Sequence, residues 1–200
     1  MKKLTNNVWF KCISFLLILS ALLSGILAVL NTVLFVPPEE RTERALQKIY
    51  GEAKTIDDIV LDVDNGDEAY TLTDCGKINK IYKIGNDTLY QAVGEKGFKN
   101  GTVTLWINVS LKDGKLVISK VVLDSSVGQS FIGSLSATFF DGFLVDVTES
   151  YEKGKFTANP LLKDNADVNF NPVSGASNSG NAACNAVNTV LHYINQGGAK

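Results

Sequence analysis

An uncharged apolar run near the N-terminus constrains the architecture of this chain more than any other feature. The run reads CISFLLILSALLSGILAVLNTVLFV over residues 12–36 and contains no charged side chain. At about 1.5 Å per helical residue, it exceeds the ~20 residues that a helix needs to cross a hydrocarbon core about 30 Å thick. The sequence therefore predicts a transmembrane helix over residues 12–36.

A cleaved secretory signal is the competing interpretation, because Lys2 and Lys3 can form its basic N-terminal region. The apolar core of a signal is only about 7–15 residues long and precedes an A-x-A-like cleavage site. This run is longer, and no convincing site follows it. We therefore expect an uncleaved, single-pass anchor in the cell membrane.

Basic residues predict the orientation of this anchor. Lys2, Lys3 and Lys11 precede the run, whereas the PPEERTER segment that follows it has no basic excess. The positive-inside rule then leaves residues 1–11 in the cytoplasm and places the remaining chain outside it.

Small residues mark one flank of the predicted span. Ala21 and Gly25 are four residues apart, a spacing that lets a second helix approach closely. Apolar spans also contain such residues without any partner, so both interpretations stay open.

The segment after the span predicts a connection to a folded domain. EERTERALQKIYG reads as a short charged helix that ends at Gly51, since glycine is common just after a helix C-terminus. We expect residues 37–79 to form a stalk helix, a linker and the start of the soluble domain. Residues 80–196 are expected to form the main part of that domain.

Alternation of apolar and other residues gives the clearest strand signal, in TVTLWINVSL at 102–111. One face of this strand is expected to be buried, and it carries Val103, Leu105, Ile107, Val109 and Leu111. The KDG sequence at 112–114 predicts a turn, and residues 115–123 return as the antiparallel partner. Residues 80–94 predict two earlier strands with a turn at Asn86 and Asp87.

The end of the chain predicts a helix with one apolar stripe. Residues at helical spacing form this stripe: Ala183, Val187, Val190, Leu191 and Ile194. A Gly/Ser loop and a short segment with Phe139, Phe140 and Phe143 precede it. Antiparallel strands combined with separate helices indicate an α+β class. We expect one transmembrane helix followed by a single extracytoplasmic domain, an antiparallel sheet flanked by helices.

Composition excludes several function classes. The formal net charge of -2 and the pI near 5.4 give no basis for neutralising nucleic-acid phosphates. The single histidine, His192, and the dispersed cysteines cannot build a metal site, and no set of residues indicates catalysis. Cys75 and Cys184 can pair in an oxidising compartment or remain buried thiols, and spacing alone leaves both open.

Small and polar residues crowd the sequence NPVSGASNSG at 171–180, just before the C-terminal helix. A P-loop is disfavoured because Asn181 stands where its lysine is required. A helix N-terminus presents unpaired N–H groups and a partial positive charge, so Gly175, Gly180 and the serine hydroxyls can cradle a phosphate. The ordinary alternative is N-capping by Ser177 or Ser179.

The order Ser174, Gly175, Ala176, Ser177 resembles the flavinylation motif of the FMN-binding domain family, Asp-x-x-Ser/Thr-Gly-Ala-Thr/Ser. That family includes the G subunit of the Rnf electron-transport complex and the C subunit of the sodium-pumping NADH:quinone oxidoreductase. Asn171 stands at the aspartate position. The resemblance implies FMN held covalently through its phosphate on Ser177. The other residues that it implies around the cofactor are Asn171, Ser174, Gly175, Ala176, Asn178 and Ser179.

The same resemblance implies a function. It predicts a membrane-anchored flavoprotein electron-transfer subunit of an Rnf-type (ferredoxin:NAD) ion-translocating redox complex. The implied partners are the other membrane subunits of the complex and a separate flavin transferase. Two alternatives stay open: a stand-alone extracytoplasmic flavin carrier for a reductase, and an anchored assembly domain without flavin.

Overall fold

The computed structural model describes residues 8–51, 60–61, 69–152 and 176–198. The chain divides into two compact units, Met1–Glu40 and Arg41–Lys200. The first unit contains helix α1, Val8–Leu34, in which no residue is buried. By length and composition α1 can cross a membrane. The helix starts four residues before the expected span and ends two residues before its expected end.

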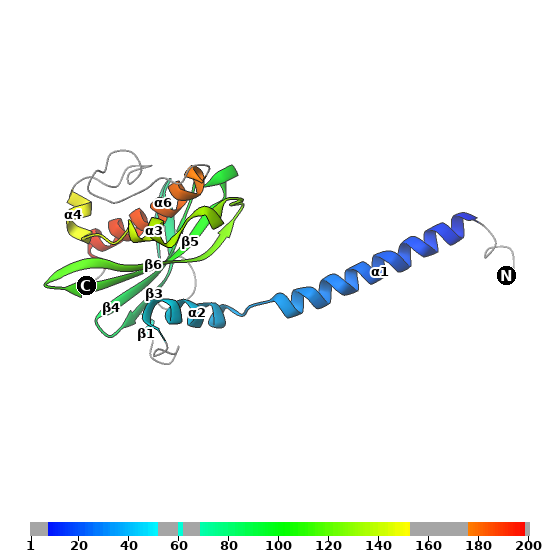
Figure 1. Cartoon of the computed structure of the whole chain (residues 1–200), viewed down its shortest axis with the longest axis horizontal. Helices are drawn as coiled ribbons and strands as arrows, with labels where there is room; N and C mark the ends of the chain where they lie inside the picture. Colours follow the sequence, from blue (N-terminus) through cyan, green and yellow to red (C-terminus); the bar gives the residue numbers. More distant parts are fainter. Residues whose placement is uncertain (1–7, 52–59, 62–68, 153–175, 199–200) are drawn as a thin grey trace. The chain divides into compact units, whose positions relative to one another are not determined.

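The second unit is built on one antiparallel sheet with the strand order β1-β3-β4-β5-β6, and β2 also pairs with β3. Figure 1 shows this sheet with helices beside it. The strands are β1 Val60–Leu61, β2 Tyr70–Leu72, β3 Gly76–Ile84, β4 Asp87–Gly94, β5 Thr102–Lys112 and β6 Lys115–Val127. This sheet and its helices confirm the predicted α+β class.

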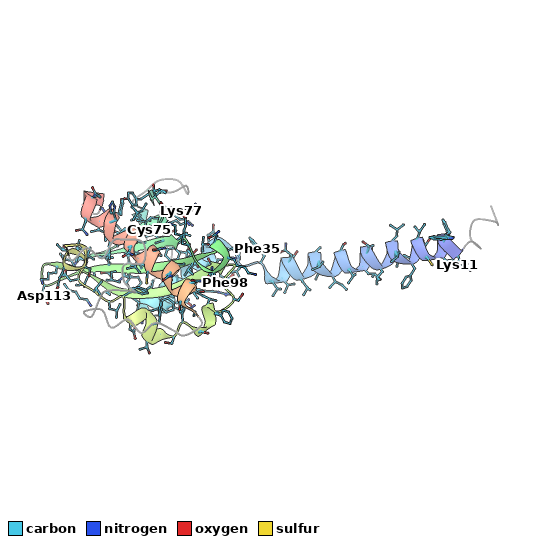
Figure 2. The ribbon with its side chains drawn as sticks, turned by 90° about the horizontal axis from the view of Figure 1, so that it is seen from above. Lys11, Phe35, Cys75, Lys77, Phe98 and Asp113 are labelled. Carbon is cyan, nitrogen blue, oxygen red and sulfur yellow. The ribbon has the colours of Figure 1, made fainter. Side chains whose placement is uncertain are left out.

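Two tight hairpins set the register of the central strands. Asp113 and Gly114 both have positive φ, which is typical of an Asp-Gly hairpin turn, and Figure 2 shows Asp113 at the tip of its hairpin. Between β3 and β4 the expected turn was one residue late. Ile84 pairs with Asp87, so the turn is Gly85–Asn86, and Gly85 takes the left-handed conformation at φ 63°.

One face of the sheet is covered by helix α6, Ser177–Tyr193. The predicted stripe from Ala183 to Ile194 is buried there, in a cluster with strand residues that include Ile81, Ile107 and Ile118. The left-handed Gly197, at φ 88°, follows in the one-turn π-helix Ile194–Gly198. The periodicity argument for this helix is confirmed.

The opposite face of the sheet is covered by helix α2, Pro38–Tyr50. Ala45 and Leu46 pack there with a second cluster that includes Leu89 and Trp106, and Figure 1 shows α2 and α6 on opposite sides of the sheet. Residues 41–50 therefore pack on the sheet as part of the domain. The compact unit starts at Arg41, within the segment 37–79 that is expected to contain the start of the soluble domain.

Burial of both faces corrects the expectation for β5. Val103, Leu105 and Ile107 face the α6 side, as predicted, but Trp106 between them is also fully buried. Leu111, expected in the core, is 58% exposed near the hairpin tip. The alternation identified the strand correctly but could not show that α2 covers its other face.

Short elements follow the sheet. β6 continues to Val127, four residues beyond its expected end. After it come the 3-10 turn Ile132–Ser134, helix α3 Ala137–Asp141 and helix α4 Val147–Glu152. Phe139 in α3 and Phe143, two residues after this helix, are buried in the α6-side core.

Candidate functional site

The first turn of α6 is not capped by a serine, contrary to the capping alternative. The helix begins at Ser177, Ala176 occupies the N-cap position, and no side chain among the described residues caps the helix. The first intrahelical bond runs from the Gly180 N–H to the Ala176 carbonyl, at 2.9 Å. The N–H groups of residues 177–179 therefore have no partner inside the helix.

A hollow of about 240 Å³ opens at this turn. It is lined by residues 176–179 together with Phe98 and Phe131. Phe98 belongs to the 3-10 turn Phe98–Asn100 between β4 and β5, and Figure 2 shows it beside the orange, N-terminal end of α6. Phe131 lies just after β6 and is 52% exposed. Helix N–H groups and two aromatic rings thus meet at one place.

The structure distinguishes Ser177 from Ser179. Ser177 and Asn178 are exposed, whereas Ser179 is 2% exposed and its hydroxyl donates to Gln129 Oε1 at 2.7 Å. Ala176 is buried at the base of the turn. Among these, only Ser177 presents an exposed hydroxyl to the hollow.

Three predicted site residues, Asn171, Ser174 and Gly175, lie outside the described residues. Their assignment to a cofactor site therefore stays a prediction.

Gln129, like Phe98 and Phe131, is a residue at this site that the sequence patterns did not predict. It is 8% exposed, and its Oε1 accepts from the Phe98 N–H at 3.0 Å as well as from Ser179. Its Nε2 donates to the carbonyls of Val127, at 3.1 Å, and Phe98, at 3.4 Å. A glutamine in a Gly/Ser loop has no periodicity that marks it, so only the long-range contacts identify it.

Backbone conformation beside the hollow is unusual. Lys96, Lys99 and Asn100 have positive φ although they carry side chains, a conformation that is uncommon outside glycine and tends to occur at functional sites. The Lys96 ammonium pairs with Asp74 at 2.9 Å. The exposed Lys99 ammonium lies 5.5 Å from the centroid of the Phe98 ring, so it places a positive charge beside one wall of the hollow.

The residues present fit the phosphate end of FMN. No described side chain caps α6, and a helix N-terminus of this kind binds anions because its N–H groups and dipole are directed at the ligand. The hollow is smaller than the ~300–1,000 Å³ of ordinary ligand pockets. The hollow can therefore take a phosphate group but not a whole flavin nucleotide.

The cysteines and the histidine of the described domain lie in buried or part-buried contacts. Cys75 and Cys184 are both free, buried thiols, and burial raises the pKa of each. Nδ1 of His192 is hydrogen-bonded to the Tyr70 hydroxyl at 2.6 Å. No group of three His, Cys, Asp or Glu side chains in the described part of the chain can hold a metal ion.

Comparison of the chain with protein-family models, curated proteins and solved structures gave no match. The resemblance to a flavinylation motif therefore rests on the sequence of residues 171–177 alone.

Proposed function

We propose that this chain is a membrane-anchored flavoprotein subunit that carries FMN as a phosphoester on Ser177. The observation that supports this most is the exposed Ser177 hydroxyl, which sits in an uncapped helix turn that opens to an aromatic hollow. The neighbouring Ser179 hydroxyl is buried and already hydrogen-bonded. In the motif of the FMN-binding domain family the last hydroxyl carries the cofactor, and Ser177 occupies that position.

Each part of the hollow has a role in this proposal. The N–H groups of residues 177–179 donate to phosphate oxygens, and the dipole of α6 favours the negative charge. Phe98 and Phe131 offer apolar faces to the flavin ring, and Lys99 adds positive charge near the phosphate. When bound, FMN supplies one- and two-electron transfer chemistry. The protein holds the cofactor in one position and shields one end of it from water.

The proposal places the flavin domain outside the cytoplasm, in an Rnf-type ion-translocating complex that links ferredoxin and NAD. Lys2, Lys3 and Lys11 before the span support this orientation. Protease added to intact spheroplasts is expected to digest the domain. If the domain is protected until the membrane is broken, the orientation is wrong.

Partner subunits are proposed to contact α1 at its small residues. An apolar hollow follows this flank and includes Ala21, Leu22 and Gly25. A side chain added at Gly25 meets no atom of this chain within 4 Å. Gly25→Leu is therefore expected to weaken co-purification with the membrane subunits while the domain stays folded. Unchanged assembly argues against a partner helix at this position.

The direct test is labelling of the full chain by a co-expressed flavin transferase. In-gel flavin fluorescence of the denatured protein is expected for wild type and is expected to disappear in Ser177→Ala. Ser130→Ala is the matched control, since Ser130 is an exposed serine in the neighbouring loop. Asn171→Asp restores the carboxylate of the motif and should label at least as well as wild type. A wild-type chain that never labels with a competent transferase refutes the proposal.

A further inference from the structure

We infer that Gln129 is a positioning residue for the proposed flavin site: it joins the first turn of α6 to the Phe98 wall and so fixes the shape of the hollow. This inference rests on the proposed function of Ser177. It concerns a side chain that the motif does not contain and that lies 48 residues before the proposed attachment point.

The amide oxygen of Gln129 connects the two sides of the hollow. On one side it accepts from the Ser179 hydroxyl, in the first turn of α6, at 2.7 Å. On the other side it accepts from the backbone N–H of Phe98 at 3.0 Å. A single oxygen atom thus bonds both to the first turn of α6 and to the backbone of Phe98.

The amide nitrogen fixes the direction in which this oxygen points. Nε2 donates to the carbonyls of Val127 and Phe98. Rotating the amide by half a turn would aim an N–H group at the Phe98 N–H donor and the amide oxygen at two carbonyls. Because a buried donor or acceptor without a partner is costly, the network holds Gln129 in one orientation.

Two glycines leave the space that the glutamine occupies. A Cβ added at Gly97 would lie 2.5 Å from Gln129 Nε2, and one at Gly101 would lie 2.4 Å from it. Both distances are too short for any real side chain. The loop from 97 to 101 therefore closes around Gln129, which explains how a polar side chain becomes 8% exposed beside an open hollow.

Gln129→Met is the sharpest variant, because methionine has a similar length and volume but makes none of the four hydrogen bonds. In unlabelled full-length protein, the Phe98 amide is expected to exchange with deuterium about tenfold faster than in wild type, the factor of roughly one net hydrogen bond. With transferase, the labelling rate is expected to fall by a similar factor. The attached flavin should show lower fluorescence anisotropy, since its surroundings are less fixed.

Ser179→Ala tests the same connection from the other end and serves if Gln129→Met does not fold. If Gln129 acts partly through Ser179, the double variant should label no more slowly than Gln129→Met alone, because the shared contact can be lost only once. Equal labelling rates and equal anisotropy for wild type and Gln129→Met overturn the positioning role and leave the proposed function intact. A wild type that never labels overturns both.

Discussion

The contact between β4 and α6 can be tested by adding one methyl group at Gly94. A Cβ built on Gly94 would lie 1.7 Å from the Ala182 carbonyl oxygen and 2.6 Å from the Ala186 nitrogen. Both atoms belong to the backbone of α6, so no side-chain rotation can relieve the clash. Gly94 is thus the position at which the last helix lies directly on the sheet.

The size of the effect follows from these distances. Cβ contacts below 3.0 Å essentially never occur, so the Ala182 oxygen has to retreat by at least 1.3 Å. The residues of α6 from Ala182 to Leu191 are all buried, so the helix can only move by disturbing the core. Overpacking of this kind typically costs about 1–3 kcal/mol. We expect Gly94→Ala to lower the free energy of unfolding by about 3 kcal/mol.

Urea unfolding of the full chain in detergent measures this loss through the fluorescence of the buried Trp106, in a background where Trp9 is replaced by Phe. With a slope near 2 kcal/mol per molar urea, the midpoint should fall by roughly 1.5 M. Gly133→Ala is the control, because a Cβ there meets nothing within 4 Å. If Gly94→Ala unfolds at the same urea concentration as Gly133→Ala, the packing of α6 on β4 is not as described.

Three further predictions concern the rest of the domain. Leu46→Ala should cost about 3 kcal/mol in the same urea assay, since Leu46 of α2 is fully buried against the sheet, whereas a helix that does not pack on the sheet predicts no change. Burial, followed by the charge of Asp87, raises the pKa of Tyr50. The unfolded chain therefore loses this proton first, and stability should fall as pH rises above about 10. The fall should be smaller in Tyr50→Phe, and equal falls contradict the assignment. In a Cys12→Ser background, which removes the exposed third thiol, Cys75 and Cys184, buried with raised pKa, should react with a maleimide only after unfolding. Fast labelling of this folded variant would contradict their burial.

Sequence periodicity was sufficient for elements that bury one regular face. The alternation along residues 102–111 identified β5, and the helical stripe from Ala183 to Ile194 identified α6 and the face that it buries. The Asp113–Gly114 turn was also readable, because both residues tolerate positive φ.

Periodicity did not predict what covers the other face of the sheet. The described part of α2 contributes only Ala45 and Leu46 to the core as fully buried apolar residues, too few to give a pattern within a charged segment. Trp106 alternates with Leu105 and Ile107, as an exposed aromatic residue does in an amphipathic strand. Its burial depends on a helix about 60 residues earlier, which local patterns do not encode.

The sequence predicted only part of the candidate site, because the rest depends on contacts between segments that are far apart in the chain. The motif and the helix start drew attention to Ser177, but the sequence alone could not decide between Ser177 and Ser179 as the available hydroxyl. That distinction depends on Gln129, which buries and occupies Ser179 from 50 residues away. Phe98 and Phe131 likewise reach the hollow from separate loops, so their role follows from the fold.

The central claim is that Ser177 carries FMN, and peptide mapping tests it most directly. The chain is co-expressed with a flavin transferase, digested with trypsin, and the peptide spanning residues 164–200 is sequenced by tandem mass spectrometry. This peptide contains all three rival serines, at 174, 177 and 179. The account predicts an added mass of FMN less one water, located on Ser177. An unmodified peptide, or the same mass on Ser174 or Ser179, contradicts it.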